Sequence, residues 1–62
     1  MRDAPTINEI RDMLYRLRDE LTSLEEKIRK RRYREAHRQV AFIINDLDKL
    51  IDMVEEYEAK QQ

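Results

Sequence analysis

Several basic residues and one tyrosine lie close together in the sequence, near the centre of the 62-residue chain. Residues 27–38, called the basic segment below, contain seven Lys or Arg side chains and one Glu, a net charge of +6. Cations of this kind can bind phosphates, and an aromatic ring can stack on a nucleobase. The candidate contacts for RNA, DNA or an acidic protein are Arg31, Arg32, Tyr33, Arg34 and Arg38.

Part of this charge also has a structural explanation. Basic side chains near the C-terminus of a helix interact favourably with the helix dipole. Glu25 with Arg29 and Glu26 with Lys30 have the i, i+4 spacing of helical ion pairs. These effects account for Arg29 and Lys30 but not for the arginines that follow, so nucleic-acid binding stays open as an alternative function.

The chain offers little for catalysis or metal binding. His37 is the only histidine, and no Cys is available as a nucleophile or as a thiolate ligand. The acidic residues between Asp46 and Glu58 lack the loop pattern of a calcium site and the Glu-x-x-His spacing of carboxylate-bridged metal bundles. We therefore expect no enzyme activity, no catalytic residue, no metal or other cofactor, and no small-molecule substrate.

The composition indicates a small chain with a mixed-charge surface. Charged residues make up 44% of it, yet the net charge is only −1. No apolar run approaches the roughly 20 residues needed to cross a bilayer, and the first residues lack the hydrophobic segment of a signal peptide. We expect no membrane contact and a cytoplasmic location. At this length, and without disulfides or zinc, association with another chain is the expected source of added stability.

Apolar residues repeat with the period of a coiled coil in two segments. The first seam consists of Ile7, Ile10, Leu14, Leu17, Leu21, Leu24 and Ile28. The second seam consists of Ala36, Val40, Ile43, Leu47, Leu50, Val54 and Tyr57. If Ile7 and Val40 are heptad position a, each seam alternates a and d positions, which predicts two amphipathic helices.

The heptads lose their phase between the two seams. Val40 follows Ile28 by 12 residues (40 − 28), where two unbroken heptads need 14. We therefore predict an all-α fold, an antiparallel hairpin of helices at about residues 6–30 and 34–60. It forms a single domain, residues 1–62, with a short N-terminal tail at residues 1–5.

The signals at the helix ends are uneven. Thr6 and Glu9 have the spacing of a capping box at the start of the first helix. No Gly, Pro, Ser, Thr, Asp or Asn marks a turn between residues 29 and 34. One long helix that pairs with copies of itself therefore stays open as the alternative architecture.

The apolar stripe is wider than one neighbouring helix can cover, because Ile44 and Ile51 occupy e positions of the second helix. Two hairpins packed as a four-helix bundle would cover it. The expected core or dimer residues are Leu14, Leu17, Leu21, Leu24, Val40, Ile43, Ile44, Leu47, Leu50, Ile51 and Val54. Leu47, central in the second seam, is expected to be buried on all sides. Phe42 lies outside both seams and is a candidate docking point.

The charges favour two hairpins that point in opposite directions. Residues 1–26 carry a net charge of −3 and residues 39–62 carry −4, so both acidic segments run away from the basic segment. Head-to-tail packing sets each basic tip beside acidic ends, a modest gain because exposed charges are screened.

This architecture of two antiparallel hairpins resembles the Rop family of small plasmid-encoded proteins. No functional motif of that family matches residues here, and its RNA-binding role is not carried over.

The sequence therefore predicts a small non-enzymatic adaptor or regulator. It is expected to act through protein–protein contacts as a homodimeric four-helix bundle, with a further protein as partner. The alternative is a nucleic-acid-binding dimer that uses the basic tip at residues 29–38.

Overall fold

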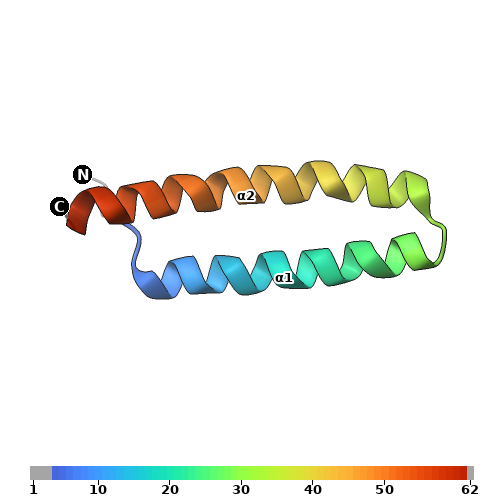
Figure 1. Cartoon of the computed structure of the whole chain (residues 1–62), viewed down its shortest axis with the longest axis horizontal. Coiled ribbons are helices and arrows are strands. Elements are labelled where there is room, and N and C mark those ends of the chain that lie inside the picture. The colour runs from blue at the N-terminus through green and yellow to red at the C-terminus, as the bar shows by residue number, and fades with distance from the viewer. Residues whose placement is uncertain (1–3, 62) are drawn as a thin grey trace.

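The chain forms an antiparallel helical hairpin (Figure 1). The computed structural model describes residues 4–61, in which α1 spans Ile7–Arg29 and α2 spans Tyr33–Gln61. Each predicted helix limit differs from the observed one by a single residue. The predicted hairpin is thus confirmed, and one continuous helix is excluded. Of the predicted tail, residues 1–3 lie outside the described part of the chain.

The N-terminus of α1 is capped as the sequence predicts. Thr6 has an extended backbone, with φ −87° and ψ 164°, and its hydroxyl oxygen accepts a hydrogen bond from the backbone N–H of Glu9 at 3.2 Å. This bond satisfies one of the N–H groups that have no partner inside the helix.

The turn between the helices has the geometry of a Schellman motif. Arg31 has a φ of 62°, in the left-handed region, directly after the C-cap residue Lys30. The Arg31 N–H donates to the carbonyl of Ile28 at 3.0 Å, and the Arg32 N–H donates to the carbonyl of Lys27 at 2.8 Å. These two bonds satisfy carbonyls at the end of α1 and reverse the chain within three residues.

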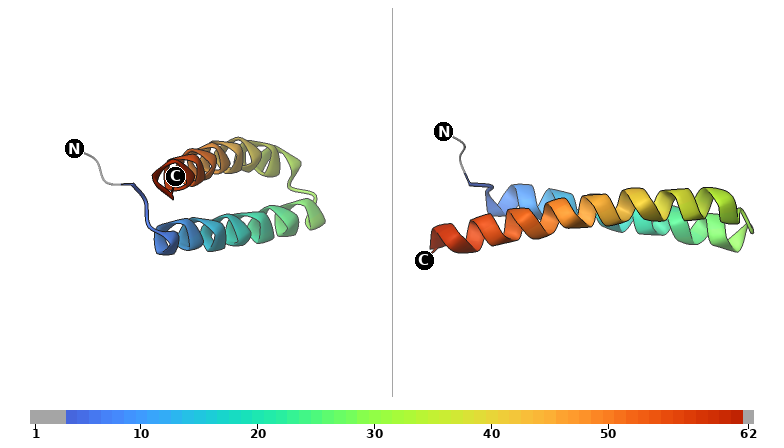
Figure 2. Two further views of the ribbon diagram at one scale, coloured as in Figure 1. Left: turned by 60° about the vertical axis from the view of Figure 1, so that its left-hand side comes forward. Right: turned by 90° about the horizontal axis from the view of Figure 1, so that it is seen from above.

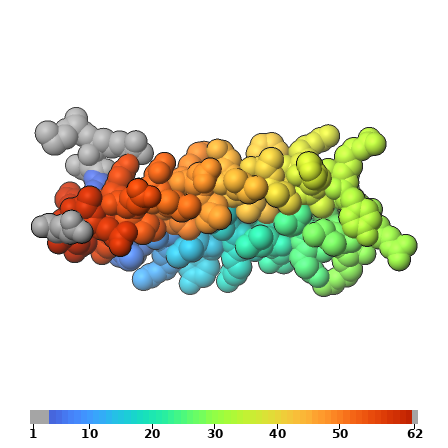
Figure 3. Space-filling model, turned by 45° about the horizontal axis from the view of Figure 1, so that its top comes forward, coloured from blue at the N-terminus to red at the C-terminus, as the bar shows by residue number. Residues whose placement is uncertain are grey.

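The core of the hairpin consists of residues at d positions. Buried side chains from α1 and α2 meet between the helices: Ile10, Leu17, Ile43 and Leu50. Ala36, another d residue, is buried near the turn. The two helices lie side by side along their length and cross at a shallow angle (Figures 2 and 3).

Candidate interaction surfaces

Residues at a and e positions form an exposed apolar face along one side of the hairpin. Each of its members is between 37% and 53% exposed. We call this surface the apolar face; it consists of Ile7, Leu14, Leu21, Ile28, Val40, Ile44, Leu47 and Ile51. In a mixed-charge protein, an exposed apolar stripe over two helices is typical of a contact site for another chain.

The two helices contribute to this face together. Leu14 and Leu21 of α1 line one shallow groove with Leu47 of α2, and the buried d residues form its floor. Arg18 and Glu25 stand along the α1 edge of this groove. The apolar face is thus a continuous strip with a charged rim on the α1 side.

The residues expected in the core divide into two groups. Within one chain, Leu17, Ile43 and Leu50 are buried, and Leu24 and Val54 are half-buried. Six others lie on the apolar face: Leu14, Leu21, Val40, Ile44, Leu47 and Ile51. Leu47 is 45% exposed, so the expectation that it is buried on all sides is wrong for a single chain. The reason is that each helix of a hairpin has only one neighbour, which covers the d residues and leaves the a residues exposed.

A polar network lies on the opposite side of the hairpin. The Lys27 ammonium group donates to the side-chain oxygen of Gln39 at 2.6 Å, and the Gln39 amide nitrogen donates to the backbone carbonyl of Glu20 at 3.2 Å. All three residues occupy g positions. None of the three is among the candidates predicted from the sequence, although polar residues at successive g positions indicate which side of a hairpin faces solvent.

Glu20 also interacts with a second carboxyl group across the hairpin. The nearby Asp46 carboxyl group and burial both raise the pKa of Glu20 above its ordinary value of 4.5. Arg16, one turn away at 3.5 Å, acts in the opposite direction. One carboxylate oxygen of Glu20 is buried without a hydrogen-bond partner.

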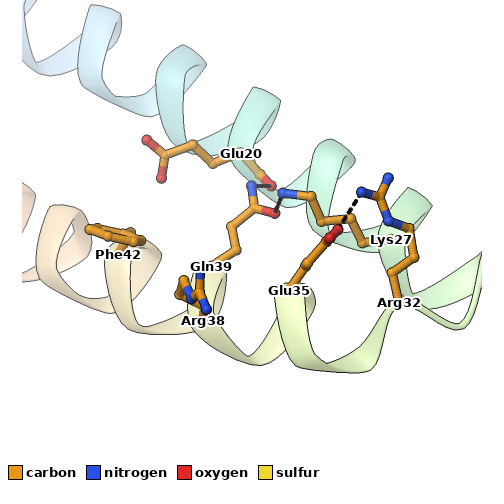
Figure 4. Close-up of a pocket in the computed structure, with 7 residues that line it drawn as sticks. All are labelled: Glu20, Lys27, Arg32, Glu35, Arg38, Gln39 and Phe42. Carbon is orange, nitrogen blue, oxygen red and sulfur yellow. Dashed lines mark hydrogen bonds and ion pairs between the residues drawn. The ribbon is translucent and has the colours of Figure 1, made fainter.

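A shallow groove on this polar side runs toward the turn (Figure 4). Phe42, which is 64% exposed, stands at one end, and the ion pair of Arg32 with Glu35 at the other. Arg38 also lines the groove. The structure thus brings three of the candidate partner contacts, Arg32, Arg38 and Phe42, to one surface.

The remaining candidates lie at the tip of the hairpin. Tyr33 is 61% exposed, and Arg31 and Arg34 are exposed as well. Within residues 4–61, no carboxylate forms an ion pair with Arg31, Arg34 or Arg38. The tip therefore presents two arginines, Arg31 and Arg34, whose charge is available to an anionic partner, and Arg38 on the groove is a third.

Neither a metal centre nor a membrane span is found in the part of the chain that the structure describes. Over residues 4–61, no group of three His, Asp or Glu side chains is placed to hold a metal ion. The helices are also not apolar enough over any stretch of sufficient length to cross a bilayer. Comparison of the chain with protein-family models, with curated proteins and with solved structures finds no match.

Proposed function

We propose that this protein is a small non-enzymatic adaptor or regulator that works as a homodimeric four-helix bundle. The observation that supports this proposal is the apolar face, because six of the seven apolar a residues are exposed in a single chain. A second hairpin carries the same face and would cover it with its own a and e residues.

The size of the face suits a second copy. The hairpin measures about 46 by 17 Å, and the apolar face runs along both helices from Ile7 to Ile28 and from Val40 to Ile51, so a second hairpin of the same length can cover all of it. Dimerisation would also increase the stability of a short chain, because it doubles the number of helices that share one core.

A dimer of this kind leaves the polar side free. Phe42 and Arg38 lie on the groove opposite the apolar face, where a further protein could dock. An exposed aromatic ring beside an unpaired cation suits a partner that offers an apolar side chain next to a carboxylate.

The test is the molar mass in solution. Sedimentation equilibrium at about 10 to 100 μM should give twice the 7.7 kDa chain mass. Leu47→Glu, which places a charge at the centre of the face, should give monomers. Phe42→Glu is the matched control, since Phe42 is also apolar and exposed but lies on the other side. A monomeric parent protein at about 100 μM would overturn the homodimer.

A second candidate function rests on the tip. The unpaired Arg31 and Arg34 and the exposed Tyr33 could bind single-stranded nucleic acid. Electrophoretic shift with short RNA and DNA at about 0.1 M salt tests this function. Replacement of Arg31 and Arg34 by Gln should then weaken binding and lower its salt dependence. The absence of any shift up to about 100 μM protein would remove this candidate.

A further inference from the structure

We propose that the outer surface of α2 near the turn binds a short acidic segment of another protein through Arg34, Arg38 and Phe42. We call these three residues the outer strip. This inference rests on the adaptor role proposed above and names the class of partner, but it does not depend on the homodimer. Three observations lead to it: the exposed ring of Phe42, two arginines that form no ion pair within residues 4–61, and a change of charge further along α2.

The residues of the outer strip lie next to one another on the surface of α2. Residues at i and i+4 of a helix are surface neighbours, so Arg38 is a neighbour of both Arg34 and Phe42. All three side chains are exposed. At 1.5 Å per residue the strip is about 12 Å long, so a helical segment of about ten residues covers it.

The outer strip stays accessible when the apolar face is covered. Phe42 and Arg38 line the groove on the polar side of the hairpin (Figure 4), and the apolar face runs along the opposite side. Phe42 is also more exposed than any residue of the apolar face. Aromatic and arginine side chains are enriched among the residues that supply most of the binding energy of protein interfaces. An exposed ring beside arginines is therefore suited to bind a further chain.

The two arginines of the strip can pair with carboxylates of a partner. Within residues 4–61, no carboxylate forms an ion pair with Arg34 or Arg38. The carboxylates that line the groove pair with other cations: Glu35 with Arg32, and the one on α1 with an arginine of α1. Guanidinium groups bind carboxylates through two parallel hydrogen bonds, so this charge favours an acidic partner.

The exposed aromatic ring of α1 is in a different situation. The guanidinium of Arg18 lies 5.1 Å from the centre of the Tyr15 ring, and Arg18 also pairs with Asp19 at 3.4 Å. The ring and the cation on α1 thus have partners within their own helix. We expect the acidic segment to bind on α2 and not on α1.

The charge further along α2 favours a short protein segment over nucleic acid. Two heptads beyond Arg34 and Arg38, the equivalent positions are occupied by Asp48 and Asp52. A nucleic-acid strand that follows α2 would bring its phosphates to these carboxylates, about 21 Å from the arginines. A segment of about ten residues ends before it reaches them. The strip also offers two free cations, which neutralise only about two phosphates.

The strip defines the side chains that a partner needs. Two carboxylates one helical turn apart would pair with Arg34 and Arg38, and an apolar side chain one turn further would pack on Phe42. In a helical segment this spacing is Glu-x-x-x-Glu-x-x-x-Leu, or the reverse order when the segment runs in the other direction.

Fluorescence polarisation with labelled synthetic peptides tests the strip. The probes are two peptides of about 15 residues, one for each order of the two Glu and the Leu. At about 0.05 M salt, at least one of them should bind with a dissociation constant on the order of 100 μM or lower. Replacement of both Glu by Gln in that peptide should weaken binding about 3- to 30-fold, because two ion pairs are lost.

Protein variants locate the binding site. Arg38→Gln should weaken binding of the probe about 2- to 5-fold. Phe42→Ala should weaken it about 5- to 30-fold, because the apolar contact with Leu is lost. Arg11→Gln and Tyr15→Ala replace an exposed arginine and an exposed aromatic residue of α1, and as matched controls they should change it less than about twofold. Circular dichroism confirms that all four variants remain helical.

The outcomes separate the outer strip from the homodimer. Leu47→Glu should bind the probe as the parent does, so a failure to dimerise does not affect this test. No saturable binding of either probe up to about 1 mM, or an equal loss in the control variants, overturns the strip and leaves the homodimer proposal intact. Displacement of the probe by a short single-stranded RNA at a lower concentration than by the unlabelled peptide also overturns it, in favour of nucleic acid.

Discussion

Arg31 adopts a backbone conformation that usually belongs to glycine. Its φ of 62° brings Cβ close to the neighbouring carbonyl, which costs about 1 to 2 kcal/mol for a residue other than Gly. The two Schellman hydrogen bonds and the packing of the helices on either side hold it there. A composition with no glycine therefore does not prevent a tight turn.

Arg31→Gly should raise the free energy of unfolding by about 0.5 to 1 kcal/mol, because the lost Cβ strain exceeds the added entropy of the unfolded chain. Urea unfolding followed by circular dichroism measures this change. Arg11→Gly is the control, since the same replacement at an exposed position inside α1 should cost about 1 kcal/mol. Equal effects of the two replacements would contradict the left-handed turn.

Glu20 gives the hairpin a pH dependence with a defined sign. Its pKa is raised above 4.5 in the folded chain, so the folded state holds the proton more tightly than the unfolded state. The contribution of Glu20 to stability is therefore full below pH 4.5 and is lost as the pH rises through the raised pKa. Glu20→Gln should stabilise the protein at pH 7, on the order of 0.5 kcal/mol, and have little effect at pH 4.

Glu26→Gln serves as the opposite case for this experiment. The ion pair with Lys30 lowers the pKa of Glu26, so its contribution is present at neutral pH and is lost as the pH falls. Thermal unfolding at pH 4 and pH 7, at one protein concentration, compares the two variants. The same sign of change for both at pH 7 would contradict the Glu20–Asp46 interaction.

At the scale of the helices, the a residues and the d residues have different roles, although both are apolar and regularly spaced in the sequence. The d residue Ile43 is 8% exposed and holds the hairpin together, while the a residue Leu47 is 45% exposed. Above the dissociation constant of the dimer, Ile43→Ala and Leu47→Ala should each cost about 2 to 5 kcal/mol. Well below it, only Ile43→Ala should retain that cost, and Leu47→Ala should cost under about 1 kcal/mol.

Urea unfolding at protein concentrations on either side of the dissociation constant measures both effects. A cost of Leu47→Ala that does not change with concentration would mean that this residue belongs to the core of one hairpin.

Apolar spacing was sufficient to predict two helices, their limits to within one residue, and a break near Arg31. It could not show which apolar row faces the other helix, because Leu14 and Leu17 are equally suited to a core. The answer depends on the flanking positions. In α2, the polar g residues Gln39 and Asp46 flank the buried d residues, while the e residues Ile44 and Ile51 flank the a residues and require further cover. The Phe42 groove also could not be predicted, since it depends on how the hairpin closes.

At the scale of the whole molecule, charge is separated along a rod about 46 Å long. The apolar face should supply most of the binding energy of the proposed dimer, and exposed charge pairs should add little. An increase in salt from about 0.05 to 0.5 M should therefore change the dissociation constant by less than about tenfold. Sedimentation equilibrium at both salt concentrations measures it. A change above about a hundredfold would mean that charge, rather than apolar contact, holds the dimer together.

The turn at Arg31 also sets an order for folding. The contact of Lys27 with Gln39 closes a loop of 12 residues, and that of Gln39 with Glu20 spans 19. Contacts around Ile10, far from the turn, must close most of the chain. The entropy lost on closing a loop grows with the length of the loop. Contacts between the two helices should therefore form first near the turn and then progressively further from it. Fraying then begins at the other end, so backbone amides near Ile10 should exchange with deuterium before those near Ala36.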